Sequence, residues 1–421
     1  MYFAVQIQRL MSLPSNSLVS FGFKTNLSGV PFKIQNRKKR IISELSKKEE
    51  ITINEIADLL NISVPTATEL TLSLVEEGLV KDTGKKSEGV GRKAAIFSLA
   101  DDSCYFLGVE IKKYKVNIGL MGFDKKMVAS SLNIPFPFLE TRESLDAIIE
   151  DIKVFLQSVN VPKEKIFGIG LSIAGRINVK TGKILTIYHF ADAPVKAILE
   201  ESLGLPVYID NDSRTLAYGE YHFGFAGTEK NVLIVNLDYG LALGIFVDGR
   251  PVYGASGYAG ELGHIPIFDN ERICFCGKKG CLETEASGIA LLRFISDKMK
   301  AGSNSILQTV WNAKGYLELE DIVEAVQKGD NLAIEGITAI GEKLGKGLAV
   351  AINLFNPELI VLGGMLSAVG EPLLLPVKTS IFQYSLSVVN NDTRLAISSI
   401  NDHAGLPGCC LLVRDKILEL V

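Results

Sequence analysis

The chain has few of the residues that mark a specialised structural class. Six cysteines in 421 residues are too few for a disulfide-based scaffold, so we expect a protein of the reducing cytoplasm. No uncharged apolar run reaches the roughly 18 residues that a membrane-spanning helix needs, so we expect no membrane insertion. The formal net charge of −4 argues against nucleic-acid binding by the protein as a whole.

The charge is distributed unevenly along the chain. Residues 1–100 carry 14 basic and 10 acidic side chains, which leaves 30 and 38 for residues 101–421. A mildly basic N-terminal quarter followed by an acidic remainder suggests two separate functions. A chain of 421 residues also exceeds the usual size of one hydrophobic core, so we expect two or three domains.

The first residues have the superficial look of a signal sequence. The stretch MYFAVQIQRLMSLPSNSLVSFGFK has one early charge, Arg9, but Pro14 and the polar residues after it interrupt the apolar core that a signal needs. We expect residues 1–33 to form a poorly ordered extension, or to follow from a start codon placed too early.

Residues 34–100 carry the pattern of three short helices followed by a hairpin. Thr52 and Glu55 form a capping-box pair, and Ser63 with Pro65 marks the start of the third helix. Gly78 ends that helix, and two expected strands then flank a glycine-rich basic tip. The three apolar faces contain Ile41, Ile42, Leu45, Ile56, Leu59, Leu60, Ala67, Leu70, Leu74 and Val75. This order predicts a winged helix-turn-helix domain.

The expected DNA contacts of this domain are mainly contacts to phosphate. The outward face of the third helix carries no arginine, so it is a weak base-reading surface, and binding should depend strongly on salt. We expect the DNA-binding residues to be Arg37, Lys38, Ser63, Thr66, Thr68, Thr71, Arg92 and Lys93. The alternative is a three-helix interaction module that touches no DNA.

Residues from about 103 onward alternate between strand and helix patterns. A β-rich hairpin opens this region at 104–123, and a second one opens at 231–254. Helical and buried-strand patterns follow each hairpin. This repeated order predicts two α/β lobes with a cleft between them, where ligands of such folds bind.

Four motifs in this region resemble those of the ROK family of repressors, open reading frames and sugar kinases. They are DND at 210–212, GELGH at 260–264, CFCGKKGCLE at 274–283 and NPELIVLGG at 356–364. The resemblance implies a two-lobed actin/hexokinase-like (ribonuclease H-like) α/β ligand domain whose ligands are sugars. A winged helix-turn-helix in front is the arrangement of the family's repressor branch. We expect domains at 34–100, 101–220 and 221–396, with 397–421 forming a C-terminal helix that packs back on the first lobe.

Three cysteines, Cys274, Cys276 and Cys281, lie close together in the third motif. A structural zinc takes four nitrogen or sulfur ligands, and the glycines between these cysteines let the loop bend back. His264 is the natural fourth ligand, and the resemblance implies the same zinc site, with the histidine also facing the sugar. The alternatives are three free thiols, or a disulfide with one thiol left over. A catalytic cysteine is disfavoured because no Cys–His–acid arrangement is evident.

The sugar-binding residues follow from the resemblance. It implies that Asn211, Asp212, Glu261, His264 and Glu283 face the sugar, and carboxylates and amides suit this role because they hydrogen-bond to hydroxyls. The alternative for the two glutamates is that they are solvated loop charges. Where the family has a sugar-contacting asparagine, this chain reads IYHFADAP at 187–194, which leaves the identity of the sugar open.

The phosphate-binding turns of a sugar kinase are altered in this sequence. Asp212 occupies the position of the family's general base, but the first turn, D-x-G-x-T in the family, is Glu110-Ile111-Lys112-Lys113-Tyr114 here. In the second turn, Tyr239 replaces a threonine. Backbone N–H groups of glycine-rich turns hold phosphates, so both changes favour loss of catalysis, with Asp212 kept as a vestigial base that bonds the sugar.

The sequence therefore predicts a transcriptional regulator, most simply a repressor, in which a monosaccharide or amino sugar modulates operator binding. Two-fold operators imply a homodimer or a dimer of dimers. The rival hypotheses are an ATP-dependent sugar kinase with a regulatory front end, and a scaffold whose pocket is empty.

Overall fold

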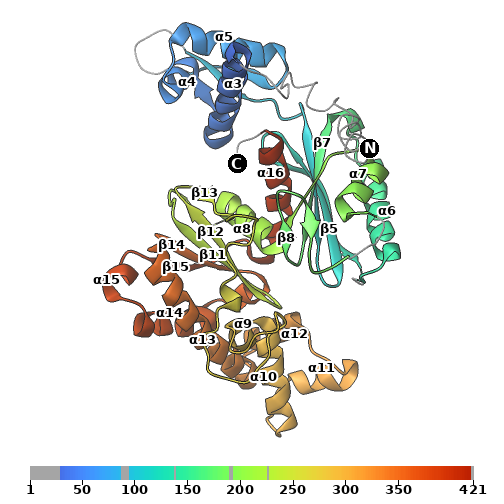
Figure 1. Ribbon diagram of the computed structural model, residues 1–421, viewed down its shortest axis with the longest axis vertical. Coiled ribbons are helices and arrows are strands. Elements are labelled where there is room, and N and C mark those ends of the chain that lie inside the picture. The colour runs from blue at the N-terminus through green and yellow to red at the C-terminus, as the bar shows by residue number, and fades with distance from the viewer. Residues whose placement is uncertain (1–28, 87–93, 137–138, 189–192, 225–226, 419–421) are drawn as a thin grey trace, which may run out of the picture.

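The computed structural model describes residues 29–86, 94–136, 139–188, 193–224 and 227–418. A small helical body with its own three-stranded sheet lies at one end of the long axis, and two five-stranded sheets follow it (Figure 1). Most of the expected N-terminal extension, residues 1–28, and the expected wing residues Arg92 and Lys93 lie outside the described residues. Within the described ranges, no helix combines the length and apolar character that crossing a bilayer requires.

The helical body contains α3 (Gly29–Lys48), α4 (Ile53–Leu60) and α5 (Val64–Glu76). Its small antiparallel sheet has the order β1 (Ile51–Thr52), β3 (Ala94–Leu99), β2 (Val80–Lys86). We call this body, residues 29–99, the reader domain. Its first helix begins at Gly29, so residues 29–33, expected in the extension, belong to that helix. Pro31 in the first turn is compatible with helix there, because the first N–H groups have no intrahelical partner.

The expected helix starts of the reader domain are confirmed. Glu55 N donates to Thr52 Oγ1 at 3.3 Å, and Thr52 N donates to a Glu55 carboxylate oxygen at 2.9 Å, which completes the capping box of α4. Ser63 caps α5 by accepting from Thr66 N. Leu59 was expected in the core, but it is exposed on α4.

The first lobe is a five-stranded sheet of order β10-β7-β4-β5-β6. The strands are β4 (Tyr105–Ile111), β5 (Lys115–Gly122), β6 (Met127–Pro135), β7 (Ile166–Ile173) and β10 (Val207–Asn211). Strands β4, β7 and β10 are parallel, and β4, β5 and β6 form an antiparallel meander. One face is covered by α6 (Arg142–Ser158) and α7 (Val195–Leu203) (Figure 1). The short elements are η1 (Lys163–Lys165), β8 (Ile177–Asn178) and β9 (Lys183–Ile184).

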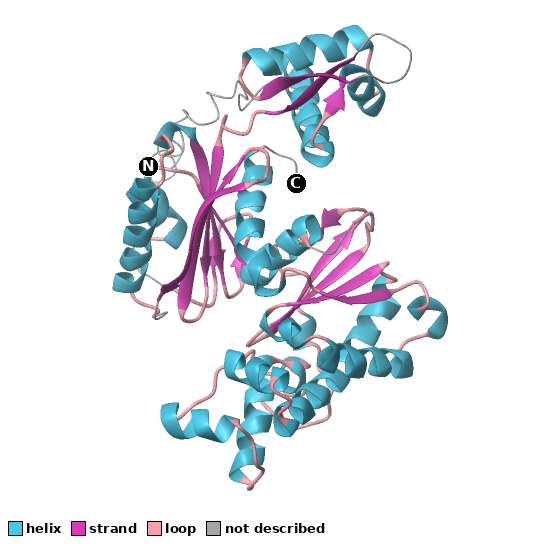
Figure 2. Cartoon of the chain, turned by 180° about the vertical axis from the view of Figure 1, so that it is seen from behind, coloured by secondary structure: helices cyan, strands magenta, loops and turns pink. Residues whose placement is uncertain are grey.

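The other face of this sheet is covered by α16 (Gly405–Ile417) and α8 (Asp212–Phe223). Two glycines let α16 approach closely. A Cβ on Gly108 would lie 2.5 Å from Cys410 Sγ, and one on Gly170 would lie 2.6 Å from the backbone oxygen of Cys409. Helices α8 and α16 also pack towards the second lobe, so they lie between the two sheets (Figure 2).

The second lobe is a five-stranded sheet of order β13-β12-β11-β14-β15. The strands are β11 (Val232–Leu237), β12 (Leu241–Val247), β13 (Arg250–Pro251), β14 (Leu359–Gly363) and β15 (Arg394–Ile397). The helices are α9 (Glu283–Ala286), α10 (Gly288–Lys300), α11 (Leu307–Lys314), α12 (Leu319–Gln327), α13 (Asn331–Phe355), α14 (Glu371–Tyr384) and α15 (Ser387–Asn390). Single turns form η2 (Leu262–His264), η3 (Met365–Val369) and η4 (Asn401–Ala404). The α/β class predicted from sequence is confirmed.

The reader domain packs directly on the first lobe. One continuous apolar cluster joins Ile41 and Leu45 of α3 to Phe106 and Phe167 of the first sheet and to Val413 of α16. Each of these side chains is buried. Removing such side chains from water stabilises the contact by roughly 1.5–3 kcal/mol each. The reader domain is therefore held in a defined position relative to the ligand domain.

Candidate functional site

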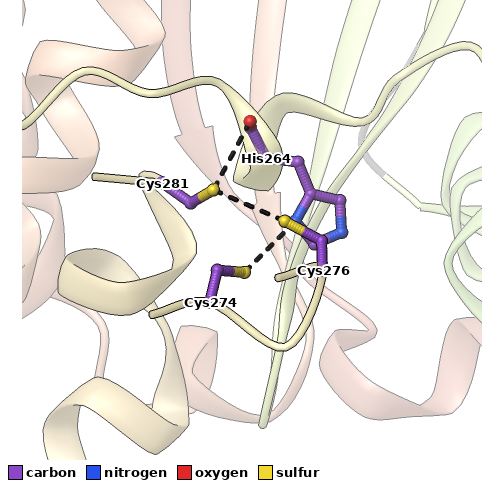
Figure 3. Close-up of side chains that lie close together, drawn as sticks. All are labelled: His264, Cys274, Cys276 and Cys281. Atoms are coloured by element: carbon purple, nitrogen blue, oxygen red, sulfur yellow. Dashed lines mark hydrogen bonds between the residues drawn. The ribbon is translucent and has the colours of Figure 1, made fainter. Parts of the chain in front are cut away.

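Four possible metal ligands converge in the second lobe (Figure 3). The loop between η2 and α9 folds back through bridges that pair Pro266 with Cys281 and Ile273 with Lys279. Gly280 makes this possible: it has a φ of +74°, and a Cβ there would lie 2.1 Å from the backbone oxygen of Phe268. The ligand atoms of His264, Cys274, Cys276 and Cys281 consequently lie within 4.8 Å of one another.

The spacing of these atoms fits a tetrahedral metal ion. Metal–sulfur bonds of about 2.3 Å imply sulfur–sulfur separations of roughly 3.8 Å. Cys276 Sγ and Cys281 Sγ are 3.7 Å apart, and Cys274 Sγ lies 3.5 Å from His264 Nδ1. No disulfide joins Cys274, Cys276 or Cys281, so the disulfide alternative is not realised. Burial raises the pKa of Cys274 to about 12, so a bound metal would have to displace its proton. The four side chains can hold a metal ion.

Two glutamates flank this cluster. Glu261 Oε2 lies 3.5 Å from His264 Nε2, the ring nitrogen on the far side from Cys274. A carboxylate at this position fixes the orientation of a metal-binding histidine. Glu283 Oε2 accepts a hydrogen bond of 3.1 Å from Leu241 N, and Glu283 Oε1 lies 3.7 Å from Cys274 Sγ. Glu283 therefore joins the cluster to the β11–β12 turn.

Asn211 and Asp212 lie where β10 ends and α8 begins, in the first lobe. Asn211 caps α8: its Oδ1 accepts from the backbone N–H groups of Ser213 and Arg214. Its Nδ2 donates to Gly175 O at 3.0 Å and to Asp212 Oδ1 at 2.9 Å. An amide side chain has two donor and two acceptor positions, and all four are occupied here. In this arrangement Asn211 positions Asp212, and a direct contact of Asn211 with a sugar stays a prediction.

Asp212, directly after the carboxyl end of β10, has one carboxylate oxygen that remains open to a ligand. Its Oδ1 is held by Asn211 Nδ2 and by the backbone N–H of Ser213 at 2.8 Å. Within the described part of the chain, Oδ2 has no hydrogen-bond partner. Burial raises the pKa of Asp212, which the hydrogen bonds from Ser213 partly oppose. A half-buried carboxylate with one free oxygen can accept a bond from, or a proton of, a sugar hydroxyl. Among the described residues, no bond joins it to Glu261, His264 or Glu283.

The two altered turns touch each other across the lobes. Lys113, between β4 and β5, places its Nζ 4.4 Å from the ring centroid of Tyr239, between β11 and β12. It also lies 4.8 Å from the ring of its neighbour Tyr114. Burial raises the pKa of Tyr239, so its hydroxyl stays protonated. This cation–π contact joins the two turns, a feature that pattern comparison of each turn alone could not reveal.

One residue near the expected sugar position shapes the wall of the first lobe. Tyr188 is buried, and its hydroxyl lies 3.1 Å from Ser144 Oγ. The neighbouring aromatic positions His189 and Phe190 lie outside the described residues.

The exposed face of α5 differs from the expected one. Thr71 is fully buried and points into the reader core, so its expected DNA contact is corrected. Thr66 Oγ1 lies 2.8 Å from Ser63 Oγ, and Thr68 Oγ1 donates to the backbone oxygen of Val64. Val64 and Leu72, which were not in the expected set, are exposed on this helix. Their i, i+8 spacing is the signal that could have found them.

The basic residues of α3 also differ in their environments. Arg37 is exposed, whereas Lys38 donates to Ser73 Oγ at 2.8 Å and pairs with Glu77, both at the C-terminal end of α5. Lys38 therefore ties α3 to α5, and Arg37 is the residue of this pair that is available to phosphate.

The geometry agrees with comparisons to known proteins. The ROK family profile matches residues 106–416, and a winged helix-turn-helix DNA-binding profile matches residues 34–81. The chain belongs to the ROK family. It is 28% identical to a xylose repressor from Caldicellulosiruptor bescii over 389 residues, 91% of this chain and 97% of that protein.

Two further relatives show the two branches of the family. A glucokinase from Halalkalibacterium halodurans is 35% identical over 260 residues, 60% of this chain and 78% of the enzyme. The crystal structure of a ROK family transcriptional regulator, a homologue of the Escherichia coli Mlc protein, superposes with a TM-score of 0.78 at 27% identity and covers 92% of this chain and 98% of its own. The repressor and the regulator thus match 91% and 92% of this chain, whereas the glucokinase matches 60%.

Proposed function

We propose that this protein is a sugar-responsive transcriptional regulator that represses by binding operator DNA and is released by a monosaccharide or amino sugar. The observation that carries the proposal is the packing of a winged helix-turn-helix on a ROK ligand domain through one continuous apolar cluster. A ligand that changes the lobe arrangement can then change the position of the reader domain.

The sugar site that we propose uses groups from both lobes. Asp212, held by Asn211, offers its free carboxylate oxygen from the first lobe. Glu261, His264 and Glu283 offer polar groups from the second lobe. A sugar in the cleft would bond to both sets, and would therefore favour one arrangement of the lobes over others.

We further propose that the cluster of His264, Cys274, Cys276 and Cys281 holds a structural zinc. Three sulfurs and one imidazole nitrogen that lie within 4.8 Å of one another are the donor set that zinc prefers. When bound, the ion would cross-link the loop, and through it would fix His264 and Glu283. We assign no catalytic step to it.

The alternative function is an ATP-dependent sugar kinase. The free oxygen of Asp212 and the similarity to a glucokinase favour it, because a carboxylate with a raised pKa suits a general base. Against it, the two turns that would hold the phosphates contact each other through Lys113 and Tyr239. We propose that Asp212 no longer acts as a base and serves as a sugar hydrogen-bond partner.

DNA contacts on the reader domain complete the proposal. Arg37, Arg92 and Lys93 would bind phosphate, while Ser63, Val64, Thr68 and Leu72 would face the major groove. Apolar side chains there can contact thymine methyl groups. Thr66 is bonded to Ser63 and would act through it.

A two-fold operator needs two reader domains, and we propose that the second lobe supplies the contact. Helices α13, α14 and α15 and the residue before α15 expose large apolar side chains: Leu354, Leu375, Phe382, Leu386 and Val388. Exposed apolar surface of this kind can mark a protein interface. A second copy of the chain would cover them, giving a homodimer or, by further pairing, a dimer of dimers. We also propose a cytoplasmic location and domain boundaries at 34–100, 101–220, 221–396 and 397–421, with the first domain beginning at Gly29.

Thermal unfolding across a panel of xylose, glucose and N-acetylglucosamine, with and without ATP and Mg²⁺, separates the three hypotheses. A shift with one sugar that ATP does not change supports the regulator. A further shift that requires ATP, with phosphorylated product, supports the kinase. No shift with any sugar in the panel supports the empty scaffold.

A further inference from the structure

A buried charge cluster lies beside the proposed sugar site. Asp210, one residue before Asn211, is 1% exposed. Its Oδ1 accepts from Arg214 Nε of α8 at 2.6 Å, and its Oδ2 accepts from Lys416 Nζ of α16 at 3.2 Å. Three elements of the first lobe are therefore joined at one carboxylate, next to the residues that would bind sugar.

The same cluster reaches the second lobe. Arg214 Nη1 donates to the backbone oxygen of Gly257, and Lys416 Nζ lies 5.6 Å from the ring centroid of Tyr253. Burial and the charge of Asp210 raise the pKa of Tyr253, so its hydroxyl stays protonated. The cluster therefore crosses the junction between the lobes, and a change in lobe arrangement must alter it.

The opposite side of α16 contacts the reader domain. Arg414 is 1% exposed, and its Nη2 donates to Ser46 Oγ of α3 at 2.6 Å. Arg414 Nη1 donates to Asp415, whose other oxygen accepts from Tyr218 of α8 at 2.6 Å. Arg414 and Lys416 are two positions apart, or about 200° around a helix, which is why they face opposite sides.

Two buried donors in this region have no partner. Arg214 Nη2 and Arg414 Nε are both without a hydrogen bond among the described residues. An unpaired buried donor is destabilising, and such exceptions call for an explanation. One belongs to the cluster at the lobe junction and the other to the contact with α3. A second arrangement of the lobes and of α16 in which Arg214 Nη2 and Arg414 Nε find acceptors would lack this destabilisation.

We propose that α16 couples the proposed sugar site to the reader domain, with Lys416 sensing the lobe junction through Asp210 and Arg414 setting the position of α3 through Ser46. This inference rests on the proposed function, and adds the route by which it is regulated. Buried charges are destabilising when they lose their partners, so a rearrangement that moves Gly257 and Tyr253 acts on Arg214 and Lys416 and, through Lys416, on α16. Helix α16 then moves α3, because Val413 and Ile417 belong to the apolar core of the reader domain.

The test compares the full-length wild type with Lys416→Met and Ser46→Ala. Alanine favours helix, and Ser46 is only half-buried, so the second variant should fold even if the first is destabilised. The controls are Lys153→Met, an exposed helical lysine of the same lobe, and Ser43→Ala on the same helix as Ser46. Thermal unfolding verifies that each variant is folded.

The quantity measured is the ratio of operator affinities without and with sugar. The operator is a duplex selected from a random-sequence pool, and the sugars are xylose, glucose and N-acetylglucosamine. Allosteric ratios are typically about 5–150-fold. We expect such a ratio for the wild type and both controls, and a ratio close to one for Lys416→Met and Ser46→Ala, with sugar binding by calorimetry retained.

Two outcomes would contradict the inference in different ways. A full response in the two test variants would overturn the route through α16 and leave the proposed function standing. A wild type that binds the duplex but responds to none of the sugars would overturn both.

Discussion

Lys113 of the first lobe lies over the ring of Tyr239 of the second, with 4.4 Å between its Nζ and the ring centroid. The two residues belong to turns that in a sugar kinase would hold the phosphates of a nucleotide. A lysine stacked on an aromatic ring is stabilised by about 0.5–2 kcal/mol, so a phosphate would have to displace it. This contact is the basis for predicting that the turns do not hold a nucleotide.

The protein should therefore neither bind ATP nor phosphorylate a sugar. Calorimetric titration with ATP and Mg²⁺, in the presence of each sugar, should give no heat of binding, and coupled assays should detect no ADP. Tyr239→Thr, which removes the ring under Lys113, should be the variant that first admits a nucleotide. ATP-dependent product from the wild type that Asp212→Asn abolishes would establish the kinase instead.

The metal cluster gives a second prediction. Purified protein should contain about one zinc per chain, since the four ligands form one closed site. Cys276→Ala should lose the metal, lower the melting temperature and weaken sugar binding, because His264 and Glu283 are no longer fixed. Phe275→Ala, whose side chain between two ligands is 97% exposed, is the matched control and should keep the zinc. Full zinc content in Cys276→Ala would exclude this site.

Thr71 gives a third prediction, which tests whether this residue belongs to the core of the reader domain or contacts DNA. Its Oγ1 is buried without a hydrogen-bond partner, and valine has the same shape without the hydroxyl. Thr71→Val should stabilise the reader domain by about 1 kcal/mol in urea unfolding, because an unsatisfied polar group is removed. Operator affinity should not change. A loss of affinity without loss of stability would return Thr71 to the DNA interface.

Asp212 gives a fourth prediction, through pH. Burial raises its pKa in the folded protein above the unfolded value, so the folded state binds the proton more tightly. The ionised group then lowers stability at neutral pH, and this loss shrinks as the pH falls through the folded pKa and is absent below the unfolded pKa. Asp212→Asn should therefore raise the melting temperature at pH 7 and have a smaller effect in acid. It should also weaken sugar binding roughly 10–150-fold, the loss of one charged hydrogen bond.

If Asp212→Asn raised the melting temperature equally at every pH, the effect could not come from the buried charge of Asp212, and this prediction would be wrong. Ser213→Ala is a useful companion variant. Ser213 Oγ lies 3.3 Å from Asp212 Oδ1, and removing that donor should raise the pKa of Asp212 further.

The family, the fold class and the capped helices could be predicted from the sequence because their signals are local. The pair Thr52–Glu55 and the cap Ser63 depend only on residues three positions apart, and the structure confirms both. Thr71 also had a local signal that was missed: it follows Ala67 by four positions, on the buried face of α5. Asn211 likewise precedes a helix, where asparagine is a preferred cap.

The relationships across lobes could not be predicted from sequence. Lys113 and Tyr239 belong to turns far apart in the chain, and their contact depends on how the two sheets are placed. Lys416 and Arg414 lie in a helix whose sequence gives no sign of its partners, because Asp210 and Ser46 come from separate sheets or domains. Such pairs follow from packing, which residue patterns along one segment do not encode.

The most direct test is a titration of full-length wild-type protein onto a fluorescently labelled duplex selected from a random-sequence pool, repeated with each sugar. We predict specific binding that weakens steeply with salt, and one sugar that lowers the affinity by about 5–150-fold. Specific DNA binding whose affinity stays the same with every monosaccharide and amino sugar would contradict sugar-responsive regulation.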